Sequence, residues 1–587
     1  MNSSSKKLDF SYAWLVFWGI VLIWNIPNMI PWERNLYPGT HWLDLQERLF
    51  KCVLVAAMFL ALFARPWMGW LASWVLCLWW LPASVAVRWL SDSPVTSNLV
   101  GMAMASSPGE LKNLILSVPP LVLIGFIGWN IVGAVLLIWL KRRTAWSWSY
   151  AGRGKVLVFC GILLIIPYVL VGGTSLGHPP AQGGARQSVD PFEEGDRSIG
   201  SDAEYPRAFP YELPWAVAQY WQARRVVDAA IADLRALPAE QSLSVGVGSP
   251  ETVVLVIGES SSRKAWHLFN PKESETTPRL DARLAKGDGL YPFTNVVAQS
   301  TSTRQAVPSM LTSQPLLWPD GKANRQATRS ITSLASRAGY TTGWFSNQAA
   351  VGRFDGVIAA YADEADIKAF LNPSSFFQQG SYDEVLLPAV QRHVTSHPKT
   401  FLVLHTMGSH FRFDHRYPPG FGLFPGQQGI EQTYKNTVAY TDALLDQIID
   451  ILSRDRRSAV MVYVSDHGQG LPDKQCNKPE INRVTVDSYE VPALVWLSPA
   501  YTDAHPLAPE VLRKNASLPY TTAAIHQTLK DLVSGPEMLS DASTVEDQGS
   551  FLRQPKVGKP QMIVAPNMRW VDFREAAMRN PCFIKEP

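Results

Sequence analysis

Two strand-like runs of the sequence end in side chains that can bind a metal ion. TVVLVI at 252–257 is followed by a glycine and then Glu259, and AVMVYVS at 459–465 is followed by Asp466 and His467. Ligands of open α/β sheets bind at the carboxyl ends of the strands, so we expect these side chains to meet. Two carboxylates and one imidazole suit Zn²⁺ with an open fourth position, and Mn²⁺ is compatible with the same ligand types.

A third strand-like run is also followed by an imidazole. After TFLVLH at 400–405 comes TMGSH, which ends in His410. An Asp-His pair after one strand is usually a solvated turn, but three strand ends with acidic or imidazole groups favour a metal site. We therefore predict that Glu259, Asp466 and His467 hold a metal ion.

The hydroxyl-rich segment at 298–313, AQSTSTRQAVPSMLTS, could supply a nucleophile to such a site. A metal lowers the pKa of a hydroxyl at its open position. On the first turn of a helix, the hydroxyl also lies in a field that favours an alkoxide and an incoming phosphate. An ordinary loop that caps a helix is an equally good interpretation. Residue types alone leave four candidates: Ser300, Thr301, Ser302 and Thr303.

The stretch GESSS at 258–262 allows a different chemistry. In a serine esterase, the G-x-S-x-G motif would make Ser260 the nucleophile. The motif asks for glycine where Ser262 stands, and His526, a later candidate partner, lies in an apparent helix. We expect the serines to cap a following helix and Glu259 to be the functional residue of this stretch.

From about residue 250, strand-like and helix-like segments alternate. The helix-like segments include YKNTVAYTDALLDQIIDILSR at 434–454. This alternation indicates a mostly parallel sheet with helices on both faces. The expected strands are 252–257, 341–346, 400–405, 459–465 and 493–498.

Residues 1–173 are predicted to form a membrane domain. The run at 120–140 carries no charge and is long enough to span a hydrocarbon core of roughly 30 Å. Buried core helices of a soluble protein are the alternative, which the uncharged, Trp-flanked runs disfavour. Together with similar runs near 11–28, 50–65, 67–88 and 155–173, about five transmembrane helices are expected.

Basic residues orient these predicted spans. Lys6 and Lys7 precede the first span, and Lys141 follows the fourth at the head of a basic loop. With five spans both segments lie on the cytoplasmic side, so the rest of the chain is outside, in the periplasm of a Gram-negative bacterium. We expect a linker at 174–249 and a catalytic domain at 250–587.

The linker contains a helix-like segment at 211–236, which could lie on the membrane surface or pack as a connecting helix. A net charge of +3 over 587 residues gives no indication of a nucleic-acid partner. Cys476 and Cys582 are the only cysteines of the predicted exported part, so at most one internal disulfide can form there.

Taken in order, the motifs resemble those of the bacterial phosphoethanolamine transferases. They are VVLVIGES, TTPRL, TSTRQAVPSML, YDEVLLPAV, FLVLHTMGSHFRFDHRYPP and VSDHG. The resemblance covers essentially the whole chain. It implies an inner-membrane enzyme with five spans and a periplasmic domain of the alkaline phosphatase/sulfatase fold. The C-terminal half, which includes the MRW segment at 568–570, is most similar to the branch that modifies the lipopolysaccharide core.

The resemblance also implies roles for single residues. The family's metal ligands match Glu259, Asp466 and His467. Its nucleophilic threonine, which also binds the metal, matches Thr303. His410 would bind the substrate phosphate and act as general acid or base, and Asn347 would contact the phosphoethanolamine.

The sequence departs from the family pattern at four places. Gln299 and Ser309 stand where the lipid A branch has two half-cystines. Asp487 stands near the place of a further histidine, so a second zinc ligand or proton donor there does not follow from the resemblance. Gln469 replaces the acidic residue that commonly follows the D-H-G motif.

The implied reaction transfers phosphoethanolamine from phosphatidylethanolamine to an envelope glycolipid, lipopolysaccharide core or lipid A, through a covalent phospho-threonine. A phosphoglycerol transferase of the lipoteichoic-acid-synthase type is the alternative enzyme. A sulfatase is disfavoured, because the nucleophile segment lacks a C/S-x-P-x-R motif. A membrane-anchored scaffold with a degenerate enzyme fold is a further alternative, against which the intact set of site residues argues. The identity of the acceptor stays open.

Overall fold

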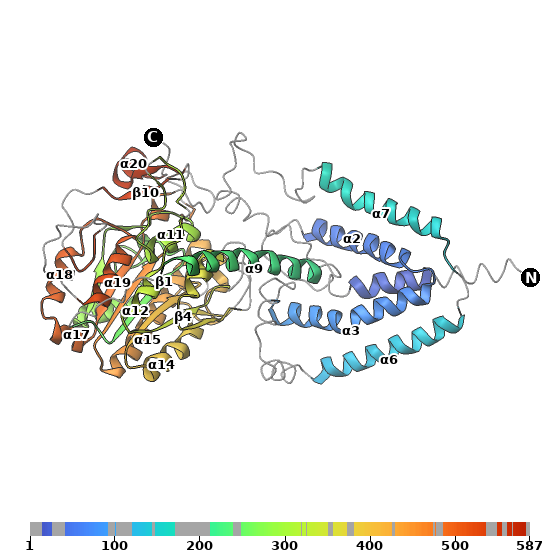
Figure 1. Cartoon of the computed structure of the whole chain (residues 1–587), viewed down its shortest axis with the longest axis horizontal. Helices are drawn as coiled ribbons and strands as arrows, with labels where there is room; N and C mark the ends of the chain where they lie inside the picture. Colours follow the sequence, from blue (N-terminus) through green and yellow to red (C-terminus); the bar gives the residue numbers. More distant parts are fainter. Residues whose placement is uncertain are drawn as a thin grey trace, which may run out of the picture. The chain divides into compact units, whose positions relative to one another are not determined.

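The chain forms two compact units, Met1–Trp221 and Gln222–Pro587, in a computed structural model (Figure 1). Each unit is described separately below. The structure describes residues 14–25, 41–91, 100, 120–143, 147–170, 212–238, 248–318, 320–324, 326–349, 356–372, 381–424, 429–472, 476, 485–535, 549–553, 560–565 and 568–582.

The first unit is helical. Besides a helix over Trp14–Asn25, it contains α2 (His41–Ala61), α3 (Pro66–Ser91), α6 (Pro120–Arg143) and α7 (Tyr150–Leu170). Each predicted span thus coincides with a helix in the described residues. Within the described residues, one stretch, Ile124–Arg142, is by length and composition long and apolar enough to cross a membrane, so the number of five spans is not confirmed.

Helix α6 carries apolar side chains on most of its exposed surface. Ile124, Ile131 and Val135 are each more than half exposed. The stretch at 120–140 of this helix carries no charge, and the three basic residues of α6 follow it. Such a stretch gains stability from apolar surroundings, because its backbone groups are satisfied internally and its side chains avoid water. The helix therefore fits the predicted span at 120–140.

The second unit is built on a seven-stranded sheet in the order β2-β8-β7-β1-β6-β4-β5. The strands are β1 (Thr252–Gly258), β2 (Leu290–Phe293), β4 (Thr341–Ser346), β5 (Ile367–Phe370), β6 (Thr400–His405), β7 (Ala459–Ser465) and β8 (Ala493–Leu497). Strands β7, β1, β6, β4 and β5 run parallel, while β8 and β2 pair antiparallel. The predicted mostly parallel α/β sheet is confirmed.

Helices cover both faces of this sheet. Val253, Leu255 and Ile257 of β1 pack in one core cluster, and Val254 and Val256 pack in the other. This alternation follows from the two-residue period of a strand, and a strand buried on both sides reads as one apolar run. The first cluster includes α11 (Thr303–Leu311), α12 (Ile331–Arg337), α13 (Gly356–Ala362), α18 (Ala508–Asn515) and α19 (Ala524–Ser534); the second includes α10 (Pro278–Lys286), α14 (Leu387–Ser396) and α15 (Ile430–Asp455).

The register of the central strands brings their carboxyl ends to one edge. Ile257 of β1 pairs with His405 of β6, and Gly258 pairs with Ser465 of β7. The residues that follow these three strands therefore begin side by side, as the sequence predicted.

A C-terminal segment packs beside the sheet. It contains β10 (Met562–Val564), β11 (Trp570–Asp572) and α20 (Phe573–Arg579), while β3 (Val296–Val297) pairs with β9 (Tyr520–Thr521). Ile563 and Phe573 lie in one cluster with Val297 and Tyr489. The segment thus braces the chain that leads into α11.

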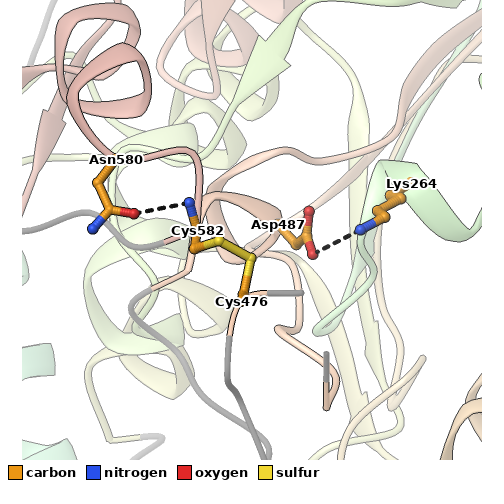
Figure 2. The surroundings of a disulfide bond; sticks show 5 residues. All are labelled: Lys264, Cys476, Asp487, Asn580 and Cys582. Atoms are coloured by element: carbon orange, nitrogen blue, oxygen red, sulfur yellow. Dashed lines mark hydrogen bonds and ion pairs between the residues drawn. A yellow bond between two sulfur atoms is a disulfide. The ribbon is translucent and has the colours of Figure 1, made fainter. Parts of the chain in front are cut away.

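A disulfide between Cys476 and Cys582 fastens this C-terminal segment (Figure 2). It joins residues 106 positions apart, and it links the end of the chain to the connection between β7 and β8. The cysteine count allowed this bond, and the structure forms it.

Most of the predicted linker at 174–249 lies outside the described residues, but the helix within it is present as α9 (Glu212–Ala236). Leu234 near its C-terminal end packs in a core cluster of the second unit, and Arg235 forms a 2.7 Å ion pair with Asp363. The last turns of α9 therefore behave as a connecting helix. Trp221 and Val226 remain exposed.

Two histidines make the stability of the second unit depend on pH. Burial lowers the pKa of His405 to about 3 and that of His526 to about 4. An unfolded imidazole titrates near 6.5, so below that pH the unfolded chain binds more protons. We expect the free energy of unfolding to fall as pH drops from about 6.5 toward 4, by at most about 1.4 kcal/mol per pH unit for each histidine.

Calorimetry of the full-length protein in detergent, between pH 7 and 5, measures this effect. His405→Leu replaces one titrating group with an apolar side chain that can stay buried. The free energy of unfolding should therefore depend less steeply on pH. An unchanged pH dependence in that variant would contradict the assignment to His405. The half-buried His526 lies within α19, as expected for a packing residue.

Candidate functional site

The three predicted metal ligands meet at the carboxyl edge of the sheet. Glu259 directly follows β1, and Asp466 and His467 directly follow β7. Each side chain is at most 1% exposed, and one ligand atom from each lies within 4.8 Å of the others. The sequence prediction that these residues come together agrees with this geometry.

The lone pairs of these ligands face one another. His467 Nε2 lies 3.6 Å from Glu259 Oε1 and 3.5 Å from Asp466 Oδ2. His467 Nδ1 lies 2.8 Å from the carbonyl oxygen of Gly468. Because a carbonyl only accepts, Nδ1 carries the ring proton and Nε2 presents its lone pair.

A divalent cation fits this arrangement. Asp466 Oδ2 is buried and has no hydrogen-bond partner among the described residues. A buried acceptor without a partner lowers the stability of a fold. Burial also raises the pKa of Asp466 to about 6. A cation bound by Asp466, Glu259 and His467 would satisfy the orphaned oxygen and offset the cost of burying the carboxylates.

Backbone contacts hold the two turns that carry the ligands. Asp466 Oδ1 accepts hydrogen bonds from the backbone N–H groups of Ser260, at 3.0 Å, and of His467, at 2.6 Å. Ser260 adopts a positive φ of 54°, and its hydroxyl donates to Glu259 Oε1 at 2.7 Å. Ser260 therefore supports Glu259, a predicted metal ligand, an arrangement that does not favour the esterase interpretation.

The serines after Glu259 do not cap a helix as expected. The element that follows is a short 3-10 turn, Arg263–Ala265, and Ser262 makes no capping bond from its side chain. Ser261 instead accepts a hydrogen bond from the indole of Trp266 at 2.8 Å. The expectation was wrong because only a three-residue turn follows, and the hydroxyls of Ser260 and Ser261 are bonded to Glu259 and Trp266 instead.

Of the four candidate hydroxyls at 300–303, that of Thr303 contacts the predicted ligands. This threonine is the first residue of α11, and its Oγ1 lies 3.3 Å from Glu259 Oε2 and 3.3 Å from His467 Nε2. Ser300 Oγ donates instead to Gln305 Oε1 at 2.6 Å. The position at a helix N-terminus also favours negative charge on the Thr303 oxygen and on an approaching phosphate.

His410 lies in the loop after β6, and this loop packs against Glu259. The backbone N–H of Ser409 donates to the carbonyl of Glu259 at 2.8 Å. Gly408 has a positive φ of 48°, and a Cβ there would lie 2.7 Å from that same carbonyl oxygen. His410 itself is 9% exposed, with Nδ1 2.6 Å from the carbonyl oxygen of Phe411.

Asn347 is fully buried behind the site. Its amide nitrogen donates to the Ser381 carbonyl at 2.9 Å and to Asp383 Oδ1 at 2.8 Å. These two acceptors take both amide protons of Asn347, and its contact with the phosphoethanolamine stays a prediction. Its neighbour Gln348 instead reaches Glu259, with 3.2 Å between Nε2 and Oε2.

Two polar residues of the site escaped the sequence analysis. Gln348 follows Asn347 directly, and nothing in the residue types distinguishes them. Asp383 lies in the YDEVLLPAV motif, and its carboxylate accepts from the backbone N–H groups of Met407 at 2.7 Å and Gly408 at 2.9 Å. Asp383 therefore shapes the loop that carries His410, and the motif was the available signal.

The departures from the family pattern have separate places in the structure. Gln299 and Ser309 are buried, as is Gln469. Asp487 lies beside the disulfide, and its Oδ2 is 3.4 Å from Lys264 Nζ (Figure 2). Among the described residues, the group that could hold a metal ion consists of Glu259, Asp466 and His467, without Asp487.

Comparisons with known proteins give the family context. A sulfatase family model matches residues 251–535. Phosphoethanolamine transferase EptC of Escherichia coli K12 is 27% identical over 420 residues, which cover 68% of each chain. Phosphoethanolamine transferase EptA of Salmonella typhimurium is 30% identical over 301 residues, which cover 48% of this chain and 52% of that protein.

A solved structure supports the fold. The C-terminal periplasmic domain of Escherichia coli EptC, crystallised in complex with Zn, matches with a TM-score of 0.50 and 23% identity. The match covers 58% of this chain and 97% of that domain. Residues 251–535 therefore form a sulfatase-family domain, and the chain is a transferase enzyme related to the phosphoethanolamine transferases.

Proposed function

We propose that this protein transfers phosphoethanolamine from phosphatidylethanolamine to an envelope glycolipid, the lipopolysaccharide core or lipid A, through a phospho-threonine at Thr303. One observation carries the proposal: Thr303 Oγ1 lies 3.3 Å from both Glu259 Oε2 and His467 Nε2. The names of the relatives indicate the phosphoethanolamine group.

In the first half-reaction, the Thr303 oxygen attacks the phosphorus of the donor. The Oγ1–P bond forms, the bond from phosphorus to the diacylglycerol oxygen breaks, and the hydroxyl proton passes to Glu259 Oε2, which faces Oγ1. Zn²⁺, or Mn²⁺, held by Glu259, Asp466 and His467 would stabilise the alkoxide and the charge on the phosphoryl oxygens. The N-terminus of α11 adds to that stabilisation.

Proton transfer at the other oxygen is assigned to His410. Its Nδ1 faces the Phe411 carbonyl, and we assign the exchange of protons with the substrate to its imidazole. His410 protonates the departing diacylglycerol oxygen. In the second half-reaction it takes the proton of the acceptor hydroxyl or phosphate, whose oxygen attacks phosphorus. The bond from phosphorus to Thr303 Oγ1 then breaks, and Glu259 Oε2 returns its proton to Oγ1.

The membrane position follows from the same proposal. We place the helical unit in the bacterial inner membrane with about five spans and the catalytic unit in the periplasm, where donor and acceptor lipids are accessible. The uncharged stretch at 120–140 of α6 supports an anchor, and the Cys476–Cys582 disulfide suits an oxidising compartment. The Zn complex of the related Escherichia coli domain supports zinc.

The donor headgroup separates this proposal from its alternatives. The full-length protein in detergent is incubated with lipopolysaccharide and with labelled phosphatidylethanolamine or phosphatidylglycerol, and the glycolipid is analysed by mass spectrometry. We expect phosphoethanolamine on the glycolipid and diacylglycerol release from phosphatidylethanolamine. Turnover of phosphatidylglycerol alone would favour the phosphoglycerol transferase. No turnover and no bound metal would favour a scaffold.

A further inference from the structure

The Gln348 side chain is built into the site without touching the predicted nucleophile. It is 2% exposed and stands just after β4. Its Nε2 donates to Glu259 Oε2 at 3.2 Å and to the backbone carbonyl of Thr406 at 2.8 Å. Both amide protons are thus directed at acceptors, one of them the carboxylate of a predicted metal ligand.

Two acceptors fix the orientation of this amide. A flipped amide would place Oε1 against the Thr406 carbonyl and against the Glu259 carboxylate, and neither group can donate. Thr406 is itself fixed, because its N–H and its hydroxyl both donate to the carbonyl of Ile257, at 3.0 and 3.1 Å. The end of β1 therefore holds Thr406, and Thr406 holds Gln348.

The carboxylate of Glu259 is held at both oxygens. Ser260 Oγ donates to Oε1 at 2.7 Å, and Gln348 Nε2 donates to Oε2. In this orientation Oε1 lies 3.6 Å from His467 Nε2, and Oε2 lies 3.3 Å from Thr303 Oγ1. Rotation of the carboxylate would move Oε1 away from His467 Nε2 and Oε2 away from Thr303 Oγ1.

We propose that Gln348 is a positioning residue that fixes the two oxygens of Glu259 in separate roles, one toward the metal and one toward Thr303. The inference rests on the proposed function for the role of Thr303. Partners that orient metal ligands typically change metal affinity by about 10–100-fold when removed. Loss of Gln348 should therefore weaken metal binding and slow the chemical step, while substrate binding changes little.

Two substitutions test this positioning role in the full-length protein. Gln348→Leu removes both donors from the buried position, and Gln348→Glu keeps the shape but replaces the donor with a carboxyl group. Zn²⁺ affinity is measured by competition with a chromophoric chelator, and the site geometry by the visible spectrum of the Co²⁺-substituted protein. We expect about 10–100-fold weaker Zn²⁺ binding, a changed Co²⁺ spectrum, and a lower kcat with KM nearly unchanged.

A buried glutamine outside the site provides the matched control. Gln561 is also 2% exposed, and its Nε2 donates to the Tyr520 carbonyl at 2.8 Å. Gln561→Leu should leave Zn²⁺ affinity and the Co²⁺ spectrum as in the wild type. Equal losses of Zn²⁺ affinity in Gln561→Leu and Gln348→Leu would overturn the proposal, because the effect would then reflect general destabilisation.

The remaining outcomes are also decisive. Wild-type Zn²⁺ affinity and Co²⁺ spectrum in either Gln348 variant would overturn the positioning role. A wild-type protein without metal affinity would overturn both this inference and the proposed metal site. A wild-type protein that binds Zn²⁺ but transfers nothing from phosphatidylethanolamine would overturn the proposed function alone, because the metal measurements need no substrate.

Discussion

Thr303→Ala should eliminate the covalent intermediate and lower the transfer rate by on the order of a thousandfold or more. The alanine removes the oxygen that lies 3.3 Å from Glu259 Oε2 and His467 Nε2. Ser300 cannot replace it without leaving Gln305, to which it donates at 2.6 Å. Acid quenching followed by peptide mass spectrometry detects the phosphoethanolamine adduct and locates it in the chain.

Two further variants control this experiment. Thr303→Ser keeps the oxygen and should retain the adduct, with a reduced rate because the side chain is less restricted. Ser300→Ala removes a hydroxyl from the same loop and should retain most of the activity. An adduct on another residue of the Thr303→Ala protein, formed at the normal rate, would show that the nucleophile is assigned wrongly.

His467→Ala should remove the metal and reduce activity below detection. The imidazole is the one nitrogen ligand of the three-residue group in the described chain. Its loss leaves Glu259 and Asp466 as two buried carboxylates, which bind Zn²⁺ less well than a set with nitrogen. Metal analysis of the purified protein should give about one Zn²⁺ per wild-type chain and almost none for the variant.

Reconstitution adds a second test of this site. After treatment with a chelator, Zn²⁺ should restore activity to the wild type but not to His467→Ala. His397→Ala, which alters a histidine of α14's C-terminal boundary, should behave as the wild type. Activity that survives complete metal removal would contradict a metal-dependent reaction.

The sequence identified the central strands but not the edges of the sheet. Strand β1 is buried at all seven positions, and such a strand appears as one apolar run. Strand β5 has the sequence IKAF and no buried residue, and β2 is only four residues long. Strand β5 thus lacks a buried apolar run, whereas the apolar LYPF of β2 is too short to be recognised as a strand from the sequence.

The site residues differ in how far the sequence could predict them. Glu259, Asp466 and His467 follow central strands, and a strand end fixes the place of the next residue. Thr303 needed the family resemblance, because four neighbouring hydroxyls have the same chemistry. Gln348 was missed because the turn after β4 decides which of two adjacent amides faces the site, and this depends on tertiary contacts.

The central place of β1 has a consequence for synthesis of the protein. Its neighbours β6 and β7 begin at Thr400 and Ala459, so roughly 140 residues must follow β1 before its first partner is made. At roughly 5–20 residues per second, this apolar strand waits about 7–28 s without a partner. Contacts of this sequence separation also form slowly. The yield of active enzyme should therefore depend on protection of the nascent chain by chaperones.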